Sequence, residues 1–222
     1  MRIALATEGK SEHWIIKHIV ETYFKGTEIL FRQIQPQIVN YTQETPGGWL
    51  EILKFCEKTD DIKSALIEAD YLVIQIDTDA SQNINYGVSH TKQGNIAKTK
   101  DELYIDVVGK LNSLINANIL EEYGEKIVFA ICIHTIECWL LPIYYTNNHK
   151  SGTQNCLTVL NTELRKQNLD ILPPKGQKNK RKLAYESILR NLRAKKDIVK
   201  SATHNVGYKK FVDSLEALEI ID

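Results

Sequence analysis

The segment from Tyr71 to Asp79 constrains the fold more than any other part of the chain, because an apolar run leads directly into two carboxylates. The run is rich in Val, Ile and Tyr, a composition that predicts a buried β-strand. Ligands bind at the carboxyl edge of the sheets that such strands form. A buried strand tolerates no charge, so we expect Asp77 and Asp79 just past its end. Residues i and i+2 point the same way, which lets both carboxylates face one point.

Two interpretations of this pair of carboxylates remain open. Like charges that are held close together repel each other unless a cation lies between them. Mg²⁺ is commonly held by one or two carboxylates together with substrate phosphates, so a divalent metal site is one interpretation. The other is an Asx-rich loop that begins a turn.

Strand-like and helix-like segments alternate along the first part of the chain. We expect strands at 2–7, 29–34, 71–76 and 126–133, and helices at 11–23, 49–69 (one broken helix or two), 99–117 and from 137 onwards. The third of these helices begins with a capping box, Thr99 to Glu102. The alternation predicts an α/β protein of three α/β/α layers, Rossmann-like, with a central and mainly parallel sheet of about four strands.

The predicted organisation is an α/β domain over residues 1–145 and a basic, helical C-terminal extension over 146–222, packed on or beside it. Helices are expected at 153–166, 182–196 and 208–218. Residues 36–48 read as a loop. The polar stretch 78–97 is long for a loop inside a compact domain, which is typical of a functional or mobile segment.

Composition narrows the class of protein. The chain has 222 residues, of which 43% are hydrophobic and 25% charged, as in ordinary soluble globular proteins. Its apolar runs are too short to span a membrane, and the first residues lack the pattern of a signal peptide, so we expect no membrane partner and a cytoplasmic location.

The four cysteines (Cys56, Cys132, Cys138 and Cys156) form no CxxC pair, which argues against a zinc site. We expect all four to be reduced.

A net charge of zero conceals a strong asymmetry. Between Lys175 and Lys210 there are twelve Lys or Arg residues against two acids. Such a block suits contact with a polyanion, although basic residues also commonly do no more than solvate helix faces. The candidates for nucleic-acid contact are Lys178, Lys180, Arg181, Lys182, His204, Lys209 and Lys210.

Acidic side chains follow three of the predicted strands. Glu8 follows the first, Asp77 and Asp79 follow the third, and Glu137 follows the fourth. The carboxyl ends of parallel strands meet at one edge of a sheet, so we expect these acids to converge. Each also has a plainer interpretation, since an acid in the first turn of a helix is favoured by the helix dipole.

Two further residues are possible members of this site. Glu12 lies about one helical turn after Glu8, and His134 ends the fourth strand. His134 is either a base or ligand beside the acids, or a hydrogen-bonded structural group. The sequence Gly9-Lys10-Ser11 is not the end of a phosphate-binding P-loop, because Ala4 stands where that motif requires its first glycine.

The Glu8-Gly9 turn after the first strand, with Asp77-Thr78-Asp79 after a later one, resembles the Toprim domain. That domain occurs in topoisomerases, primases, recombination-mediator proteins and OLD-family nucleases. The segment Ile136-Glu137-Cys138-Trp139 is similar to small prokaryotic Toprim-like families, some of which are encoded near ATPases in anti-phage loci. The resemblance covers about residues 1–142.

The resemblance implies a role for each matching residue. Glu8 corresponds to the Toprim glutamate, a metal ligand or general acid/base, and Asp77 and Asp79 correspond to the metal-binding pair. Glu137 corresponds to a further acid that can act as a ligand. The implied cofactor is Mg²⁺ or Mn²⁺, and the implied function is a nuclease, a metal-dependent phosphodiesterase that acts on DNA or RNA. The resemblance also implies a role in prokaryotic defence with an ATPase partner.

Two other functions fit parts of the pattern. The chain is alternatively a catalytically inactive Toprim-like module that binds nucleic acid or protein. An Asp-x-Asp sequence after an apolar strand also occurs in phosphatases and nucleotide-sugar transferases, although neither class explains Glu8-Gly9 or the basic block.

Overall fold

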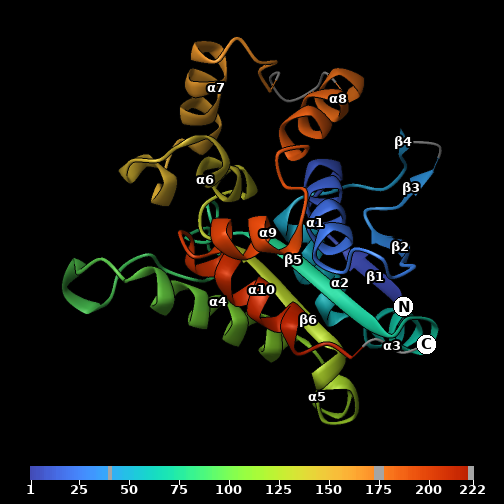
Figure 1. Cartoon of the computed structure of the whole chain (residues 1–222). Coiled ribbons are helices and arrows are strands. Elements are labelled where there is room, and N and C mark those ends of the chain that lie inside the picture. Colours follow the sequence, from blue (N-terminus) through green and yellow to red (C-terminus); the bar gives the residue numbers. More distant parts are fainter. Residues whose placement is uncertain (40–41, 173–177, 220–222) are drawn as a thin grey trace.

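The computed structural model describes residues 1–39, 42–172 and 178–219, and for residues 178–181 it describes the course of the helix but not the side chains. A four-stranded parallel sheet with the order β2-β1-β5-β6 forms the centre, and helices cover both of its faces (Figure 1). The protein therefore has the three-layer α/β architecture that the alternation of segments predicts.

The strands of the sheet agree with the sequence expectation to within one residue at each end. They are β1 (Arg2–Ala6), β2 (Leu30–Gln35), β5 (Tyr71–Asp77) and β6 (Ile127–Cys132). One detail of the prediction is wrong. Asp77 is the last residue of β5, in register with Cys132 of β6, and does not lie past the strand.

Alternate residues of the strands enter two separate hydrophobic cores, because successive side chains of a strand point to opposite faces. Ile3, Leu5 and Val73 pack into one core, whereas Ala4 and Leu72 pack into the other. A sheet that is covered on both faces favours apolar residues at successive positions, which explains the apolar run from Tyr71 to Ile74 in β5.

Each core is closed by its own layer of helices. The second core contains residues of α2 (Trp49–Glu57), α3 (Thr59–Glu68), α4 (Lys100–Leu114) and α5 (Ala117–Tyr123), which is followed by the 3₁₀ turn η2 (Gly124–Lys126). The first core contains residues of α1 (Lys10–Tyr23), α7 (Cys156–Lys166), α8 (Lys178–Leu189), α9 (Lys195–Ala202) and α10 (Val206–Glu216). The segment 49–69 is thus two helices, and the capping box of Thr99 and Glu102 at the start of α4 is confirmed.

The C-terminal helices pack directly on the sheet. Phe211 and Leu215 of α10 belong to the same core as Val128 of β6, and α10 lies along that strand (Figure 1). The helix expected at 182–196 is instead two helices, since α8 ends at Leu189 and α9 begins at Lys195. The C-terminal helices α7 to α10 therefore help to build the core of the α/β layers.

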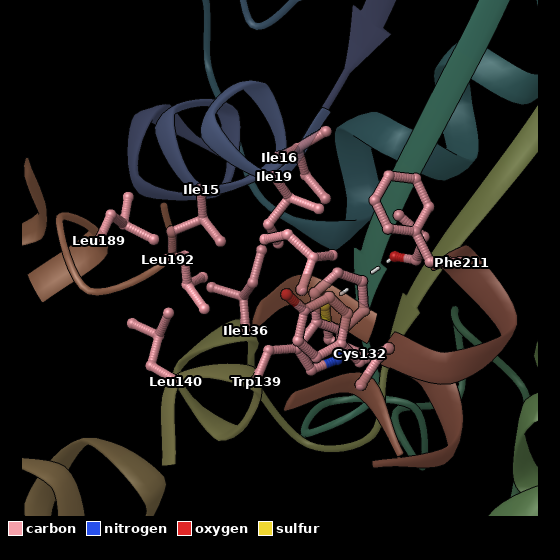
Figure 2. Close-up of a cluster of buried hydrophobic side chains, with 14 of the residues drawn as sticks. Ile15, Ile16, Ile19, Cys132, Ile136, Trp139, Leu140, Leu189, Leu192 and Phe211 are labelled. Atoms are coloured by element: carbon pink, nitrogen blue, oxygen red, sulfur yellow. Dashed lines mark hydrogen bonds between the residues drawn. The ribbon is translucent and has the colours of Figure 1, made fainter. Parts of the chain in front are cut away.

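The connection from β6 to α7 consists of short helical pieces. These are η3 (Ile136–Leu140), α6 (Leu141–Tyr144) and η4 (Asn148–Ser151). Trp139 of η3 is fully buried and stacks on Tyr208 at a ring-centroid distance of 4.8 Å. Figure 2 shows Trp139 and Ile136 between the isoleucines of α1 and Phe211 of α10. The apolar side chains of η3 thus anchor this connection in the core.

Two segments expected to be loops contain some structure. Residues 36–48 include a small antiparallel hairpin of β3 (Ile38–Val39) and β4 (Thr42–Gln43). The long polar stretch contains the 3₁₀ turn η1 (Gln93–Asn95), and its Tyr86 is fully buried. The hydroxyl of Tyr86 donates a hydrogen bond to the carbonyl of Asp77 at 3.2 Å, which ties this stretch to the end of β5. In the described ranges we find no helix with the length and apolar character needed to cross a membrane.

The contact between α10 and β6 predicts a sharp difference between two glycines. A Cβ atom at Gly207 would lie 1.9 Å from the carbonyl oxygen of Ile131, whereas a Cβ at Gly109 in α4 would meet nothing within 4 Å. We expect Gly207→Ala to lower the free energy of unfolding by about 1–3 kcal/mol, the usual size of an overpacking penalty. Gly109→Ala, the matched control, should raise it by about 0.5–1 kcal/mol. Urea denaturation of both variants measures the difference, and equal effects would contradict this packing.

Candidate functional site

A pocket of about 580 Å³ lies at the carboxyl ends of the central strands, and five carboxylates line it. They are Glu8, Glu12, Asp77, Asp79 and Glu137. The structure therefore brings together the acids that follow three different strands, as the parallel arrangement of the sheet leads us to expect. His134, the other possible member of the site, lines the same pocket.

Glu8 is fixed to the neighbouring strand through its side chain and its backbone. Its carboxylate accepts a hydrogen bond from the backbone N–H of Asp77 at 2.7 Å, and its own N–H donates to the side-chain oxygen of Gln75 at 3.1 Å. Its carbonyl accepts from the N–H of Gly48 at 2.7 Å. A Cβ at Gly47 would lie 2.3 Å from that carbonyl, so only glycine lets the chain approach Glu8 this closely.

Asp77 is one of two deeply buried acids of the pocket, with 7% of its surface exposed. Its carboxylate accepts a hydrogen bond from the side-chain amide of Gln75 at 2.9 Å. Burial and then the neighbouring charges of Glu8, Glu12, Glu137 and Asp79 raise the pKa of Asp77 well above its ordinary value. The other acids of the pocket therefore act together against the charged form of Asp77.

Gln75 is a site residue that sequence reasoning missed. It is fully buried within β5 and bridges two of the acids, because its oxygen accepts from Glu8 while its amide donates to Asp77. The signal was present in the sequence, since Gln75 is the one amide in an otherwise apolar run and stands two residues before Asp77. That spacing places both side chains on the same face of the strand.

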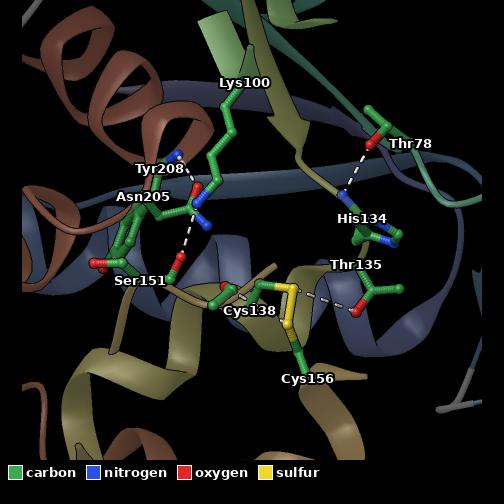
Figure 3. Close-up of a disulfide and its surroundings, with 10 residues drawn as sticks. Thr78, Lys100, His134, Thr135, Cys138, Ser151, Cys156, Asn205 and Tyr208 are labelled. Atoms are coloured by element: carbon green, nitrogen blue, oxygen red, sulfur yellow. Dashed lines mark hydrogen bonds between the residues drawn. A yellow bond between two sulfur atoms is a disulfide. The ribbon is translucent and has the colours of Figure 1, made fainter. Parts of the chain in front are cut away.

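Asp79 and His134 lie where the ends of β5 and β6 are joined. The N–H of His134 donates to the hydroxyl of Thr78 at 2.8 Å, as Figure 3 shows. The carbonyl of His134 accepts from the N–H groups of Thr78 and Asp79. His134 has a φ of 66°, an uncommon conformation that this set of hydrogen bonds stabilises. Unlike Asp77, Asp79 is exposed to solvent.

A second histidine, His90, supports His134 and was not among the expected site residues. The two rings lie edge to face at 5.8 Å, and Nε2 of His90 lies 2.8 Å from the Ser81 hydroxyl and 3.0 Å from the Thr78 carbonyl. Burial, and then the proximity of His90, lower the pKa of His134, while Asp79 acts in the opposite direction. The polar stretch after β5 therefore packs against His134 through His90.

Glu137 lies on η3 and is almost fully buried, with 7% of its surface exposed. Its carboxylate accepts a hydrogen bond from the hydroxyl of Tyr185 at 2.6 Å. Tyr185 belongs to α8 and is itself buried, so a C-terminal helix completes the site. No local sequence pattern pairs these two residues, which are 48 positions apart.

Glu12 is in the first turn of α1, directly behind the Glu8-Gly9 turn. A Cβ at Gly9 would lie 2.9 Å from a carboxylate oxygen of Glu12, so the glycine leaves room for this side chain. The position explains how a residue one helical turn after Glu8 still lines the pocket.

The residues predicted to contact nucleic acid lie in several different parts of the structure. Lys182 lines a groove beside the pocket. His204 lies in a different pocket, together with Lys150 and Lys200. Lys209 forms an ion pair with Asp213 at 2.7 Å. The side chains of Lys178, Lys180 and Arg181 lie outside the described residues.

Lys210 also lies away from the acidic pocket. Its ammonium group is 3.6 Å from a carboxylate oxygen of Asp101 and 5.3 Å from the centre of the Tyr104 ring. Both partners belong to α4. Among the side chains that the structure describes, the basic residues clustered in the sequence therefore do not form one continuous surface with the acids.

The expectation that all four cysteines are reduced is wrong for two of them. Cys138 and Cys156 form a disulfide, shown in Figure 3, whereas Cys56 and Cys132 are free and buried. The pair joins η3, next to Glu137, to the first residue of α7, where Cys156 lines the pocket. Sequence spacing gave no sign of the bond, because the contact depends on how α7 folds back onto η3.

The donor set of the pocket suits Mg²⁺ or Mn²⁺, since both ions prefer carboxylate oxygens. In the structure, however, these side chains are not arranged as a coordination sphere. Over the parts of the chain that the structure describes, no three His, Cys, Asp or Glu side chains are arranged to hold a metal ion. Glu8 and Glu137 are instead engaged with the Asp77 amide and the Tyr185 hydroxyl.

The disulfide predicts a dependence of stability on reductant. It closes a loop of 18 residues, and such a loop typically stabilises a fold by about 3 kcal/mol. We expect dithiothreitol to lower the melting temperature of the wild-type protein. The variant Cys138→Ser with Cys156→Ser should melt at the lower temperature with or without reductant. Alkylation and intact mass measurement without reductant should find two reactive thiols after unfolding, and four would exclude the bond.

The environment of Asp77 predicts how stability varies with pH in metal-free buffer. Its pKa is higher in the folded than in the unfolded state, so the folded state binds the proton more tightly and the free energy of unfolding falls as pH rises above about 3.8. Asp77→Asn keeps an oxygen for Gln75 and removes the charge. We expect it to raise the free energy of unfolding at pH 7 by roughly 1–3 kcal/mol, the order of the cost of a buried uncompensated group.

The control for this experiment is Asp106→Asn, because Asp106 is exposed on α4 and paired with Lys98 at 2.6 Å. Its effect should stay within about 0.5 kcal/mol at every pH. Denaturant titrations between pH 4 and pH 8 measure both variants. A wild-type protein that gains stability relative to Asp77→Asn as pH rises would contradict the assignment of a repelling charge to Asp77.

Comparison of the chain with family models, with curated proteins and with solved structures gives no match. The case for a function therefore depends on the geometry and chemistry of the acidic pocket.

Proposed function

We propose that the protein is a divalent-metal-dependent phosphodiesterase that acts on nucleic acid. The observation that carries this proposal is the convergence of five carboxylates from three strand ends on one pocket. The pocket lies at the carboxyl edge of the sheet, which is the edge at which parallel α/β sheets bind their ligands. The resemblance of Glu8-Gly9 and Asp77-Thr78-Asp79 to the Toprim domain points to the same chemistry.

The electrostatics of the pocket favour a cation as its ligand. Four carboxylates act on Asp77 and disfavour its charged form, and a bound divalent ion would reverse that effect. When bound, Mg²⁺ or Mn²⁺ supplies an activated water and stabilises charge on the attacking and leaving oxygens of a phosphodiester. Asp77 and Asp79 are the first candidates to hold the ion, followed by Glu8 and Glu137.

The surrounding residues orient these groups. Gln75 holds the carboxylate of Asp77 and the backbone of Glu8, and Tyr185 holds Glu137. His134 lies at the rim of the pocket beside Asp79 with a lowered pKa. A neutral imidazole in that place is suited to accept a proton from water.

A second function, a binding module without catalysis, is favoured by one observation. The described part of the chain contains no set of three ligands that is already arranged for a metal. In this alternative the hydrogen bonds of Glu8 and Glu137 are the permanent state of the site. The defence role and the ATPase partner rest on the resemblance alone and stay predictions.

The proposal is tested by cleavage assays together with a direct measurement of metal binding. Purified protein is incubated with plasmid, single-stranded DNA and RNA in Mg²⁺ or Mn²⁺, and Mn²⁺ binding is measured by titration calorimetry. We expect the variant Asp77→Asn with Asp79→Asn to lose cleavage by at least about 100-fold, the effect typical of groups at a reacting centre. It should also bind Mn²⁺ more weakly.

Asp106→Asn is the matched control, since it removes an exposed acid of α4 that lies outside the pocket lining. It should cleave and bind Mn²⁺ as the wild type does. Cleavage that survives the double substitution would exclude this site as the catalytic centre. Nucleic-acid binding without metal binding or cleavage would establish the binding module instead.

A further inference from the structure

A second depression of about 840 Å³ lies beside the acidic pocket, and we name it the α1–α8 groove. Residues of α1, β2 and α8 line it, and Trp14 lines both the groove and the acidic pocket. The two depressions therefore share a wall, and a chain-like ligand that is held at the acids can continue past Trp14 into the groove.

The lining of the groove combines aromatic rings with cations. Trp14 and Phe31 are partly buried, so part of each ring remains open to a ligand. The cations are Lys17, Lys182 and Arg190. This combination is the one that proteins use to bind unpaired nucleotides, where rings stack on the bases and cations follow the phosphates.

Two acids in the groove lower its net charge without preventing phosphate binding. Glu21 pairs with Lys17 at 3.6 Å and Glu186 pairs with Lys182 at 3.5 Å. Exposed pairs of this kind contribute little to stability, so a phosphate can replace the carboxylate. Among the described residues, Arg190 forms no ion pair, and its guanidinium is exposed at the end of α8.

His13 and Gln33 form part of the lining of the groove, and their side chains lie against each other. The amide nitrogen of Gln33 donates to the Thr7 hydroxyl and the Gln35 carbonyl. These hydrogen bonds hold the Gln33 side chain in place, so this part of the groove is polar and fixed.

We infer that the α1–α8 groove binds the nucleotides that flank the phosphodiester at the acidic pocket, and that the ligand is single-stranded nucleic acid. In a duplex the faces of the bases are already stacked on one another, so Trp14 could not stack on them. The inference rests on the proposed function in one respect, namely that the phosphodiester to be cleaved lies at the acidic pocket. Binding in the groove is nevertheless measurable without cleavage.

The test uses fluorescence anisotropy with labelled 12-nucleotide DNA, RNA of the same sequence, and the corresponding DNA duplex. Titrations are made in Ca²⁺ and, separately, in EDTA, and cleavage of each probe is checked on gels. We expect the wild-type protein to bind the single strands more tightly than the duplex, and the DNA and RNA arms identify the preferred strand. Trp14→Leu should weaken single-strand binding by about 5- to 150-fold, the range for loss of one base–aromatic stack.

The cations are tested through the dependence of affinity on salt. Lys17→Gln with Arg190→Gln should reduce the slope of log K against log salt by about 1.4, since each phosphate contact on a single strand contributes roughly 0.7. Lys63→Gln is the control, because Lys63 is exposed on α3, which belongs to the helical layer on the other face of the sheet. Its slope should equal that of the wild type.

The outcomes separate this inference from the proposed function. Tight single-strand binding that depends on Trp14, with no cleavage in Mg²⁺ or Mn²⁺, would support nucleotide binding in the groove and contradict the proposed phosphodiesterase activity. The inference that the groove binds single strands would be wrong if the protein does not bind them, if it prefers the duplex, or if both groove variants keep the wild-type affinity. This holds whatever the protein cleaves. Circular dichroism of each variant establishes that it is folded before its affinity is compared.

Discussion

The parallel pairing of β5 with β1 and β6 is the constraint on which the candidate site depends. The register sets Ala6 beside Ile74 and Asp77 beside Cys132, so β5 and β6 end at the same level. The turn after β1, which ends three residues earlier, brings Glu8 to the backbone N–H of Asp77. Residues from distant parts of the sequence are thereby placed around one pocket. The two hydrophobic cores stabilise this register, because a shift by one residue would move every strand side chain to the opposite face.

The acids of the pocket work against the stability of the fold that positions them. Burial and four neighbouring charges disfavour the ionised form of Asp77. The structure offsets this in part with neutral donors, namely the Gln75 amide, the Tyr185 hydroxyl and the backbone N–H of Asp77. Donors of this kind orient carboxylates without neutralising them. A site in which four neighbouring acids disfavour the charge of Asp77 is suited to binding a cation, and this is the strongest physical argument for the proposed metal.

Sequence reasoning succeeded where the controlling interactions are local. The apolar run of β5 and the capping box of Thr99 and Glu102 depend on neighbouring residues, and both were read correctly. It failed where the partner is distant along the chain. The disulfide of Cys138 and Cys156 needs α7 to return to η3. The contact of Tyr185 with Glu137 needs α8 to pack beside α1.

The C-terminal segment shows why charge clustered in a sequence is a weak guide to a binding surface. Its apolar residues complete the core that contains β6, and this packing fixes where each basic residue points. Lys209 and Lys210 are thereby paired with Asp213 and Asp101, whereas Arg190 is turned towards the groove next to Trp14. The polyanion contact that the basic block suggests is therefore best sought along α1 and α8, where cations, rings and the acidic pocket lie together.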